Sequence, residues 1–144
     1  MGNGESYMPV THVSNAYPRN IYAKVEVDRV YLQRVHAEVS VEVENQKGSA
    51  TGDAEWKLIE KVATAKGFTK IMPRQFLPFK PQTTEQNVYI SIFTVDEYGN
   101  KEDIAVAHPL LLNDSVIVSA EGQMLQGRKG DLWIDANHKN HKKW

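Results

Sequence analysis

The feature that most constrains this fold is a two-residue hydrophobic period in the first third of the chain. Apolar residues alternate with polar ones over 21–28 and again, after the pattern slips at Asp28-Arg29 and resumes, over 35–44. Such alternation is typical of strands that bury one face. We therefore expect two half-buried strands, with a β-bulge or a bend at the shift, because slippage by one residue would otherwise turn the apolar set outward.

One helix is expected to interrupt this β pattern. After the glycine-containing segment 48–52, Asp53 can accept hydrogen bonds from the free amides of a helix start, and Gly67 is a suitable stop. Between them, apolar residues recur at helical spacing, at Trp56, Ile59, Val62 and Ala63. The pattern predicts a short helix near 53–66.

The middle of the chain is predicted to return to strands. A short strand at 68–72 precedes the segment 73–81, whose prolines restrict it to a loop or a sheet edge because proline lacks a backbone donor. Segment 87–95 is apolar in both phases, as in a central strand covered on both faces. Residues 98–100 are expected to form a turn.

The last third indicates more strands and completes the predicted architecture. Strand candidates lie at 104–107, where Pro109 is expected to end the strand, and at 116–118, 124–125 and 132–134, which are expected to form a meander. The whole pattern predicts a mainly β fold, a two-layer antiparallel β-sandwich of about 7–8 strands with one short helix near 53–66. We expect a single domain over 9–136, between a flexible N-terminal tail, 1–8, and a basic C-terminal tail, 137–144.

Composition limits the classes of function. The 144 residues carry a formal net charge of −1 and no cysteine. General binding to nucleic acid needs an excess of Lys and Arg, and thiolate metal sites, disulfides and cysteine nucleophiles need the missing thiols. No stretch approaches the roughly 18 apolar residues that span a bilayer, and no secretory signal follows the start. We expect a soluble, cytoplasmic protein without a cofactor.

The N-terminal sequence predicts a lipid attachment. Its first six residues, MGNGES, match the pattern for N-myristoylation of Gly2. One acyl chain binds membranes only marginally, so a second attraction is needed. The C-terminal residues Lys139, Lys142 and Lys143 would supply it at an anionic membrane surface. The alternative interpretation is a plain, flexible segment rich in small residues.

Two segments are candidates for contact with an anionic partner. No acidic residue lies between Lys61 and Thr84, where cations such as Arg74 alternate with rings such as Phe76. Such interleaving is typical of single-stranded nucleic-acid and lipid-headgroup surfaces, but phenylalanines between prolines also close the end of a β-sandwich core. Arg128 and Lys129 lie at an expected hairpin tip, where they would touch an anion or form a plain solvated turn.

A glycan is a further candidate ligand. Trp133 has the opposite strand phase to its two neighbours, and it shares that phase with Asp135. An outward tryptophan beside a carboxylate can stack on a sugar ring, whereas an inward one belongs to the core. Tyr98 and loop carboxylates would complete such a site.

Catalytic and metal signatures are weaker. No nucleophile elbow, zinc-protease motif or phosphate loop is present. His36 and Glu38 would form an acid–base pair only with a third partner supplied by the fold, and otherwise both face solvent on a strand. Asp135, His138 and His141 could converge on a metal from one helical turn, but neighbouring lysines oppose it.

The sequence therefore predicts a non-catalytic binding module that associates reversibly with a membrane through Gly2. A glycan-binding β-sandwich is the first alternative, and an enzyme with a spatially assembled histidine and carboxylate site is the second. Its partner would be a protein, an anionic membrane surface or a glycan, and nucleic acid is not favoured. The candidate ligand-binding residues are Trp133, Tyr98, Arg128, Lys129, Arg74 and Phe76. No catalytic residue and no metal ligand is assigned.

Overall fold

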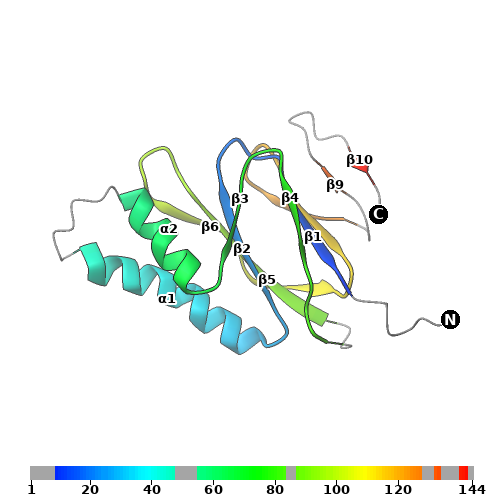
Figure 1. The fold of residues 1–144 in the computed structure, drawn as a ribbon, viewed down its shortest axis with the longest axis horizontal. Coiled ribbons are helices and arrows are strands. Elements are labelled where there is room, and N and C mark those ends of the chain that lie inside the picture. The colour runs from blue at the N-terminus through cyan, green and yellow to red at the C-terminus, as the bar shows by residue number, and fades with distance from the viewer. Residues whose placement is uncertain (1–8, 48–54, 84–86, 128–131, 134–139, 143–144) are drawn as a thin grey trace.

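The computed structural model of this protein describes residues 9–47, 55–83, 87–127, 132–133 and 140–142, with side chains described up to residue 127. Within these residues the chain is mainly β, with two four-stranded sheets, one two-stranded sheet and two helices (Figure 1). The elements are β1 (Thr11–Asn15), β2 (Ile21–Glu26), α1 (Arg29–Lys47), α2 (Glu55–Ala65), β3 (Thr69–Ile71), β4 (Phe76–Phe79), β5 (Asn87–Val95), β6 (Lys101–Leu111), β7 (Ser115–Val118), β8 (Met124–Gly127), β9 (Leu132–Trp133) and β10 (Asn140–Lys142).

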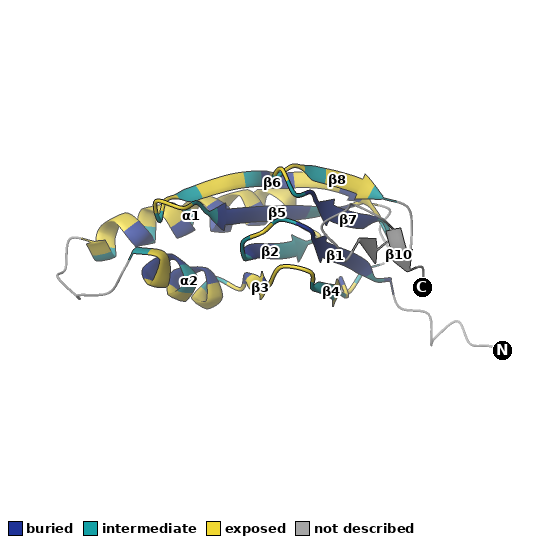
Figure 2. Ribbon diagram, turned by 90° about the horizontal axis from the view of Figure 1, so that it is seen from above, coloured by how far each residue is buried: buried dark blue, intermediate teal, exposed yellow. Residues whose placement is uncertain are grey.

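The two larger sheets have the strand orders β3-β2-β5-β6 and β4-β1-β7-β8. Their strand pairs are antiparallel except for β1 with β7. Viewed from above, the central strands β1, β5 and β7 are largely buried, while β6 and β8 at the edges are largely exposed (Figure 2). The interior strands therefore hold the core, and the edges and loops remain open to solvent.

One pair of chain segments passes through both sheets. β3 pairs with β2, where Ile71 lies opposite Ile21, and β4 pairs with β1, where Phe76 lies opposite Ser14. We call the four strands together the shared ribbon. Because the two segments stay paired on both sides of the crossing, their connecting loops, 16–20 and 72–75, come together at the same end of the β3-β2-β5-β6 sheet.

The β3-β2-β5-β6 sheet is buried on both faces. One face shares a core with the other large sheet, and we call this the aliphatic core; its buried members are Val13, Ile21, Ala23, Ile71, Val88, Ile90, Ile92, Ala105, Leu110, Val116 and Val118. The opposite face packs against both helices, and we call this the helix-side core; its buried members are Tyr22, Val35, Val39, Val43, Leu58, Ile59, Val62, Ala63, Phe68 and Phe93. The prediction that 87–95 is a strand covered on both sides is confirmed.

The predicted strand over 35–44 is wrong, because these residues lie in α1. After β2 the chain bends at Val27, and Asp28 then caps the helix by accepting a hydrogen bond from the backbone N–H of Tyr31 at 3.0 Å. The shift in the pattern therefore marks a change of element. The buried positions of α1 are three or four residues apart, at Leu32, Val35, His36, Val39 and Val43. Valines at every second position satisfied the strand period as well, and their β-branched side chains favoured it.

The predicted helix near 53–66 is confirmed as α2, which is the second of two described helices and not the only one. It stops at Gly67, whose φ of 92° is left-handed, and the N–H of Phe68 then bonds back to the carbonyl of Ala63 at 2.9 Å. The short strand after it is confirmed as β3, and the proline-containing segment includes an edge strand, β4.

Two expectations about the last third of the chain are wrong. Pro109 does not end the strand, since β6 continues to Leu111; a proline is tolerated there because β6 is an edge strand, and one side of an edge strand forms no ladder hydrogen bonds. The predicted meander is also incomplete. β7 pairs with β8, but β9 pairs with β10 in a separate two-stranded sheet.

Candidate functional site

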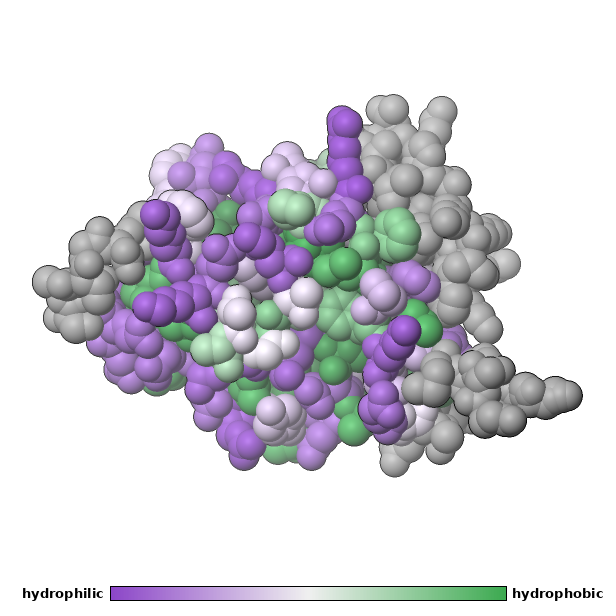
Figure 3. Space-filling view, viewed as in Figure 1, coloured by the Kyte–Doolittle hydropathy of each residue, from purple (hydrophilic) through white to green (hydrophobic). Residues whose placement is uncertain are grey.

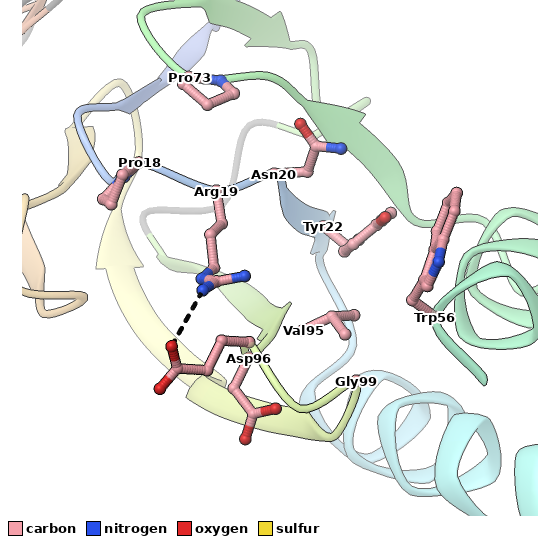
Figure 4. A pocket seen from close by; sticks show the side chains of 10 residues that line it. Pro18, Arg19, Asn20, Tyr22, Trp56, Pro73, Val95, Asp96 and Gly99 are labelled. Carbon is pink, nitrogen blue, oxygen red and sulfur yellow. Dashed lines mark ion pairs between the residues drawn. The ribbon is translucent and has the colours of Figure 1, made fainter. Parts of the chain in front are cut away.

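A pocket of about 400 Å³ opens where α2 meets the loops of the shared ribbon and the β5–β6 turn (Figure 4). We call it the loop pocket. Tyr22 and Trp56 stand on one side of it, and Arg19 and Asp96 stand on the other. A concave site with an aromatic wall and a few convergent polar groups is the usual form of a small-molecule site.

Asn15 fixes the first wall of the loop pocket. This fully buried side chain donates hydrogen bonds to the carbonyls of Arg19 and Ile71, both at 2.9 Å, and its Oδ1 accepts one from the N–H of Tyr17 at 2.9 Å. It thus joins loop 16–20 to the end of β3. Since a buried amide with all these bonds has little freedom to move, the wall is rigid.

The adjoining loop, 72–75, is held by the backbone of the same residue. The N–H of Arg74 donates to the carbonyl of Asn15 at 2.8 Å, and the N–H of Asn15 donates to the carbonyl of Gln75 at 2.9 Å. Arg74 has a φ of 66°, a left-handed conformation that is uncommon for a residue other than glycine. The hydrogen bonds keep the loop in this unfavourable geometry, beside the lining residue Pro73.

The β5–β6 turn forms the opposite wall. Asp96 Oδ1 accepts hydrogen bonds from the N–H groups of Tyr98 and Asn100, both at 2.9 Å, which closes a tight loop. Gly99 provides the positive φ, 85°, that this turn needs. The turn therefore holds the side chain of Tyr98, which is 79% exposed, at its tip.

The aromatic wall combines a buried and an exposed ring. Tyr22 is buried, stacks on Phe93 with ring centroids 5.1 Å apart, and donates a hydrogen bond from its hydroxyl to Glu60 Oε1 at 3.2 Å. Burial and the charge of Glu60 raise the pKa of Tyr22 above its ordinary value, so the hydroxyl stays protonated. Trp56 is 48% exposed, and Lys57 Nζ lies 5.6 Å from the centroid of its ring.

The polar wall carries a weak ion pair. Arg19 Nη2 and Glu97 Oε2 are 4.0 Å apart, and both side chains are substantially exposed. An exposed pair at this distance contributes little to stability. Both groups can therefore exchange this contact for hydrogen bonds to a ligand at small cost.

A histidine–carboxylate pair lies beside the helix-side core, with the histidine buried and the carboxylate partly exposed. His36 Nε2 donates to Asp103 Oδ1 at 2.8 Å, and Lys101 Nζ donates to the same oxygen at 2.6 Å. Burial lowers the pKa of His36 despite the attraction of Asp103, and the ring lies against Phe68 and Phe93. Burial alone would raise the pKa of Asp103, but its hydrogen bonds from His36 and Lys101 hold it below the ordinary value.

The prediction that His36 and Glu38 face solvent together is wrong. His36 is 2% exposed, and Glu38 instead lies 3.6 Å from Lys66 Nζ. The strand pattern had placed both residues on one polar face, but on a helix they lie 200° apart by the usual helical geometry of about 100° per residue. The enclosed ring of His36 is not presented to a ligand.

Two of the predicted ligand-binding residues lie beside the loop pocket but do not line it. Arg74 follows the lining residue Pro73, and Tyr98 precedes the lining residue Gly99. Phe76 lies elsewhere, half-buried in β4 with its ring 5.9 Å from that of His12. Trp133 lies in β9, but its side chain is outside the described part of the chain.

The remaining predicted sites lie outside the described residues. These are Gly2, Arg128 and Lys129, together with the tail residues Asp135 and His138. His141 falls in β10, where side chains are not described. Within the described residues, no three side chains of metal-binding type come together.

The sequence pattern did not indicate that Trp56 lines a pocket. It placed Trp56 on the buried stripe of the helix, whereas the buried positions of α2 are Leu58, Ile59, Val62 and Ala63. Position 56 lies at the margin of that stripe. This position was the signal that the ring of Trp56 could be exposed. Among the rings of the basic segment, Phe68 is buried and Phe76 and Phe79 are half-buried, as expected if they close the core.

No protein-family model, curated protein or solved structure matches this chain. Its function therefore has to be argued from the geometry of the loop pocket.

Proposed function

We propose that this protein is a non-catalytic binding module and that its ligand enters the loop pocket. The observation that supports this most is the half-exposed ring of Trp56, which faces the Arg19–Glu97 pair across a concave site. The walls are fixed by hydrogen bonds of Asn15 and Asp96. A preformed site of this kind binds a ligand with little loss of conformational entropy, because its loops are already ordered.

Among the predicted partners, a glycan fits these groups best. The C–H face of a sugar ring is apolar and packs on an aromatic face, while its hydroxyls pair with planar polar groups. Trp56 would supply the aromatic face, and Arg19, Asn20 and the carboxylates of Asp96 and Glu97 would supply the planar groups. In this proposal, Trp56 has the sugar-stacking role that the sequence pattern suggested for Trp133.

Two further parts of the sequence-based prediction stay proposals. The aliphatic core contains side chains from both large sheets, which supports a two-layer β-sandwich as the framework of the module. Among the described residues, neither helix has the length and apolar character to cross a membrane. Reversible membrane attachment through Gly2 is supported by the N-terminal pattern, and the intact mass of protein from cells with an N-myristoyltransferase tests it.

The test of the loop pocket is a glycan array probed with the wild type, three variants and one control variant. We expect Trp56→Ala to weaken the retained signals about tenfold or more, Trp56→Phe to restore part of the affinity, and Tyr98→Ala to have a smaller effect. Tyr31→Ala is the matched control, since Tyr31 is a partly exposed aromatic residue on α1 outside the pocket.

Two results would contradict the proposal. One is a glycan array on which the folded wild type binds no sugar. The other is binding that Trp56→Ala leaves unchanged while thermal denaturation shows that the variant is folded.

A further inference from the structure

A shallow hollow of about 440 Å³ lies beside the loop pocket, on the surface of α2 and β3. It is lined by Lys57, Glu60, Lys61, Thr64 and Lys70, and we call it the lysine hollow. The surface around the helices is largely hydrophilic in Figure 3. Three ammonium groups and one hydroxyl around one carboxylate leave the hollow positively charged.

The lysine hollow and the loop pocket adjoin each other. Tyr22, which lines the pocket, lies directly opposite Lys70 in the β2–β3 pairing. The two side chains meet at Glu60, whose Oε1 is 3.2 Å from the Tyr22 hydroxyl and 2.9 Å from Lys70 Nζ. Trp56 of the pocket is also followed directly by Lys57 of the hollow. A ligand on Trp56 is thus at the margin of the hollow.

The charges of the hollow are unevenly compensated. Glu60 is engaged by Lys70 and Tyr22. Lys57 and Lys61 are four residues apart on α2, both are exposed, and neither forms an ion pair with a carboxylate in the described part of the chain. Like charges at this spacing destabilise a helix slightly. An anion bound between Lys57 and Lys61 would remove that repulsion.

We propose that the ligand of the loop pocket is an acidic glycan, with its ring on Trp56 and a sulfate or carboxylate substituent between Lys57 and Lys61. This inference rests on the proposed function and adds the class of sugar. Lys57 links the two subsites, because its Nζ lies 5.6 Å from the centroid of the Trp56 ring. A substituent on a sugar that stacks on this ring is therefore within reach of the ammonium group.

The opposite end of the site sets the orientation of the sugar. Asp96 and Glu97 on the β5–β6 turn carry two negative charges against the one positive charge of Arg19, so this end of the site disfavours an anionic substituent. They accept hydrogen bonds from sugar hydroxyls instead. The acidic substituent is therefore directed toward α2 and the hydroxyls toward the turn.

An anionic lipid or a single-stranded nucleic acid fits these groups less well. The rings of the basic segment are buried or half-buried, at Phe68, Phe76 and Phe79, so they offer no platform for stacked bases. The half-exposed ring next to the hollow is Trp56, and across the loop pocket it faces residues of loops 16–20 and 96–100. A concave site of about 400 Å³ suits a single ring and its substituents.

The experiment measures affinities of the full chain for matched pairs of oligosaccharides by calorimetry. One pair is dextran and dextran sulfate, and the other is methyl-esterified and free oligogalacturonate, so that sulfate and carboxylate are tested separately. We expect at least one acidic member to bind about tenfold more tightly than its neutral partner, with the difference reduced by salt. Lys57→Gln/Lys61→Gln should remove this preference and leave the neutral affinity, whereas Trp56→Ala should weaken both members.

The control variant, Lys80→Gln/Arg34→Gln, removes two exposed charges outside the hollow and should retain the preference. Equal affinity for both members of each pair would overturn the acidic class while leaving the loop pocket as a sugar site. Binding of neither member would overturn both proposals. Polyvinyl sulfate and phosphatidylserine vesicles complete the test: if either binds as tightly as the acidic sugar and Trp56→Ala has no effect, the lysine hollow binds polyanions or membranes and not a glycan.

Discussion

The two faces of the β3-β2-β5-β6 sheet are built from the same strands but differ in chemistry. Toward the other large sheet, the buried members of the core are all Val, Ile, Leu or Ala. Toward the helices, neighbouring positions of the same strands carry Tyr22 and Phe93, and His36 of α1 reaches across to Asp103. Successive residues of a strand point to opposite faces, so neighbouring residues of one strand contribute to two different cores.

The difference teaches where a binding site can form in this molecule. The aliphatic core lies between the two large sheets and presents mainly hydrocarbon side chains, and the buried Thr94 hydroxyl in the same phase of β5 already donates to the carbonyl of Asn20 at 2.7 Å. On the helix side, polar groups stay near the surface because the helices supply partners for them, such as Glu60 for the Tyr22 hydroxyl. The loop pocket opens at the end of this second face.

The largest expected effect tests how much the aliphatic core contributes to the free energy of unfolding. Ile90 is fully buried there, and replacement by alanine removes three carbons and leaves a cavity between two sheets that cannot close it. We expect Ile90→Ala to lower the free energy of unfolding by about 3–4 kcal/mol, measured by urea denaturation. Val106→Ala, at an exposed position of β6, should change it by less than about 0.5 kcal/mol. An equally small loss for Ile90→Ala would show that the two faces do not differ as described.

A smaller effect should distinguish the helix-side face by its response to pH. The pKa of His36 is lowered by burial, so between pH 6.5 and its folded pKa the unfolded chain binds a proton that the folded chain does not. The stabilising contribution of the neutral ring is therefore complete above about pH 6.5 and falls as the pH decreases, by at most about 1.4 kcal/mol per pH unit. His12, whose pKa burial also lowers, adds to the same trend.

This dependence is measured by urea denaturation at a series of pH values between 7.5 and 5. His36→Gln retains a donor toward Asp103 without a titrating ring, and we expect it to flatten the curve. His108→Gln, at an exposed position, is the matched control and should leave the curve unchanged. A His36→Gln curve as steep as that of the wild type would exclude His36 as the source.

The smallest effect concerns the hydrogen bond between the helix-side core and α2. Tyr22→Phe removes the donor to Glu60 but keeps the stacked ring, and Glu60 retains Lys70. We expect a loss of about 1 kcal/mol in the free energy of unfolding, also from urea denaturation. Tyr31→Phe, on a partly exposed tyrosine of α1, should be neutral, and a Tyr22→Phe variant as stable as the wild type would show that this bond is not formed in solution.

Much of the β framework could be predicted from the sequence because a two-residue period over a short segment, as in 21–26, is typical of a strand that buries one face. β2 was predicted in this way, and the doubly covered β5 was predicted from a segment that is apolar in both phases. α1 was not predicted, because its valines fit both a strand and a helix. In addition, His36 is a polar residue at a buried helical position, so the pattern assigned that position to a solvent-exposed face. Local pattern cannot decide between two periods when both place the same residues inward.

The candidate site was less accessible to sequence reasoning for a different physical reason. Its walls come from loop 16–20, loop 72–75, the β5–β6 turn and α2, which are far apart along the chain. The pairing of β1 with β4 and β2 with β3 brings the first two together, and no local pattern contains that information. Arg74 and Tyr98 were singled out for their residue type, and the fold placed both beside the pocket.

The shared ribbon also has a mechanical consequence. Because its strands belong to both large sheets, the two loops at the crossing cannot separate unless one sheet rotates against the other. Asn15 resists that rotation, because its backbone and its side chain form hydrogen bonds with segments on both sides of the crossing. In the proposed function, this rigidity would select ligands by size, because a ligand too wide for the loop pocket enters only if the loops move apart and the framework is strained.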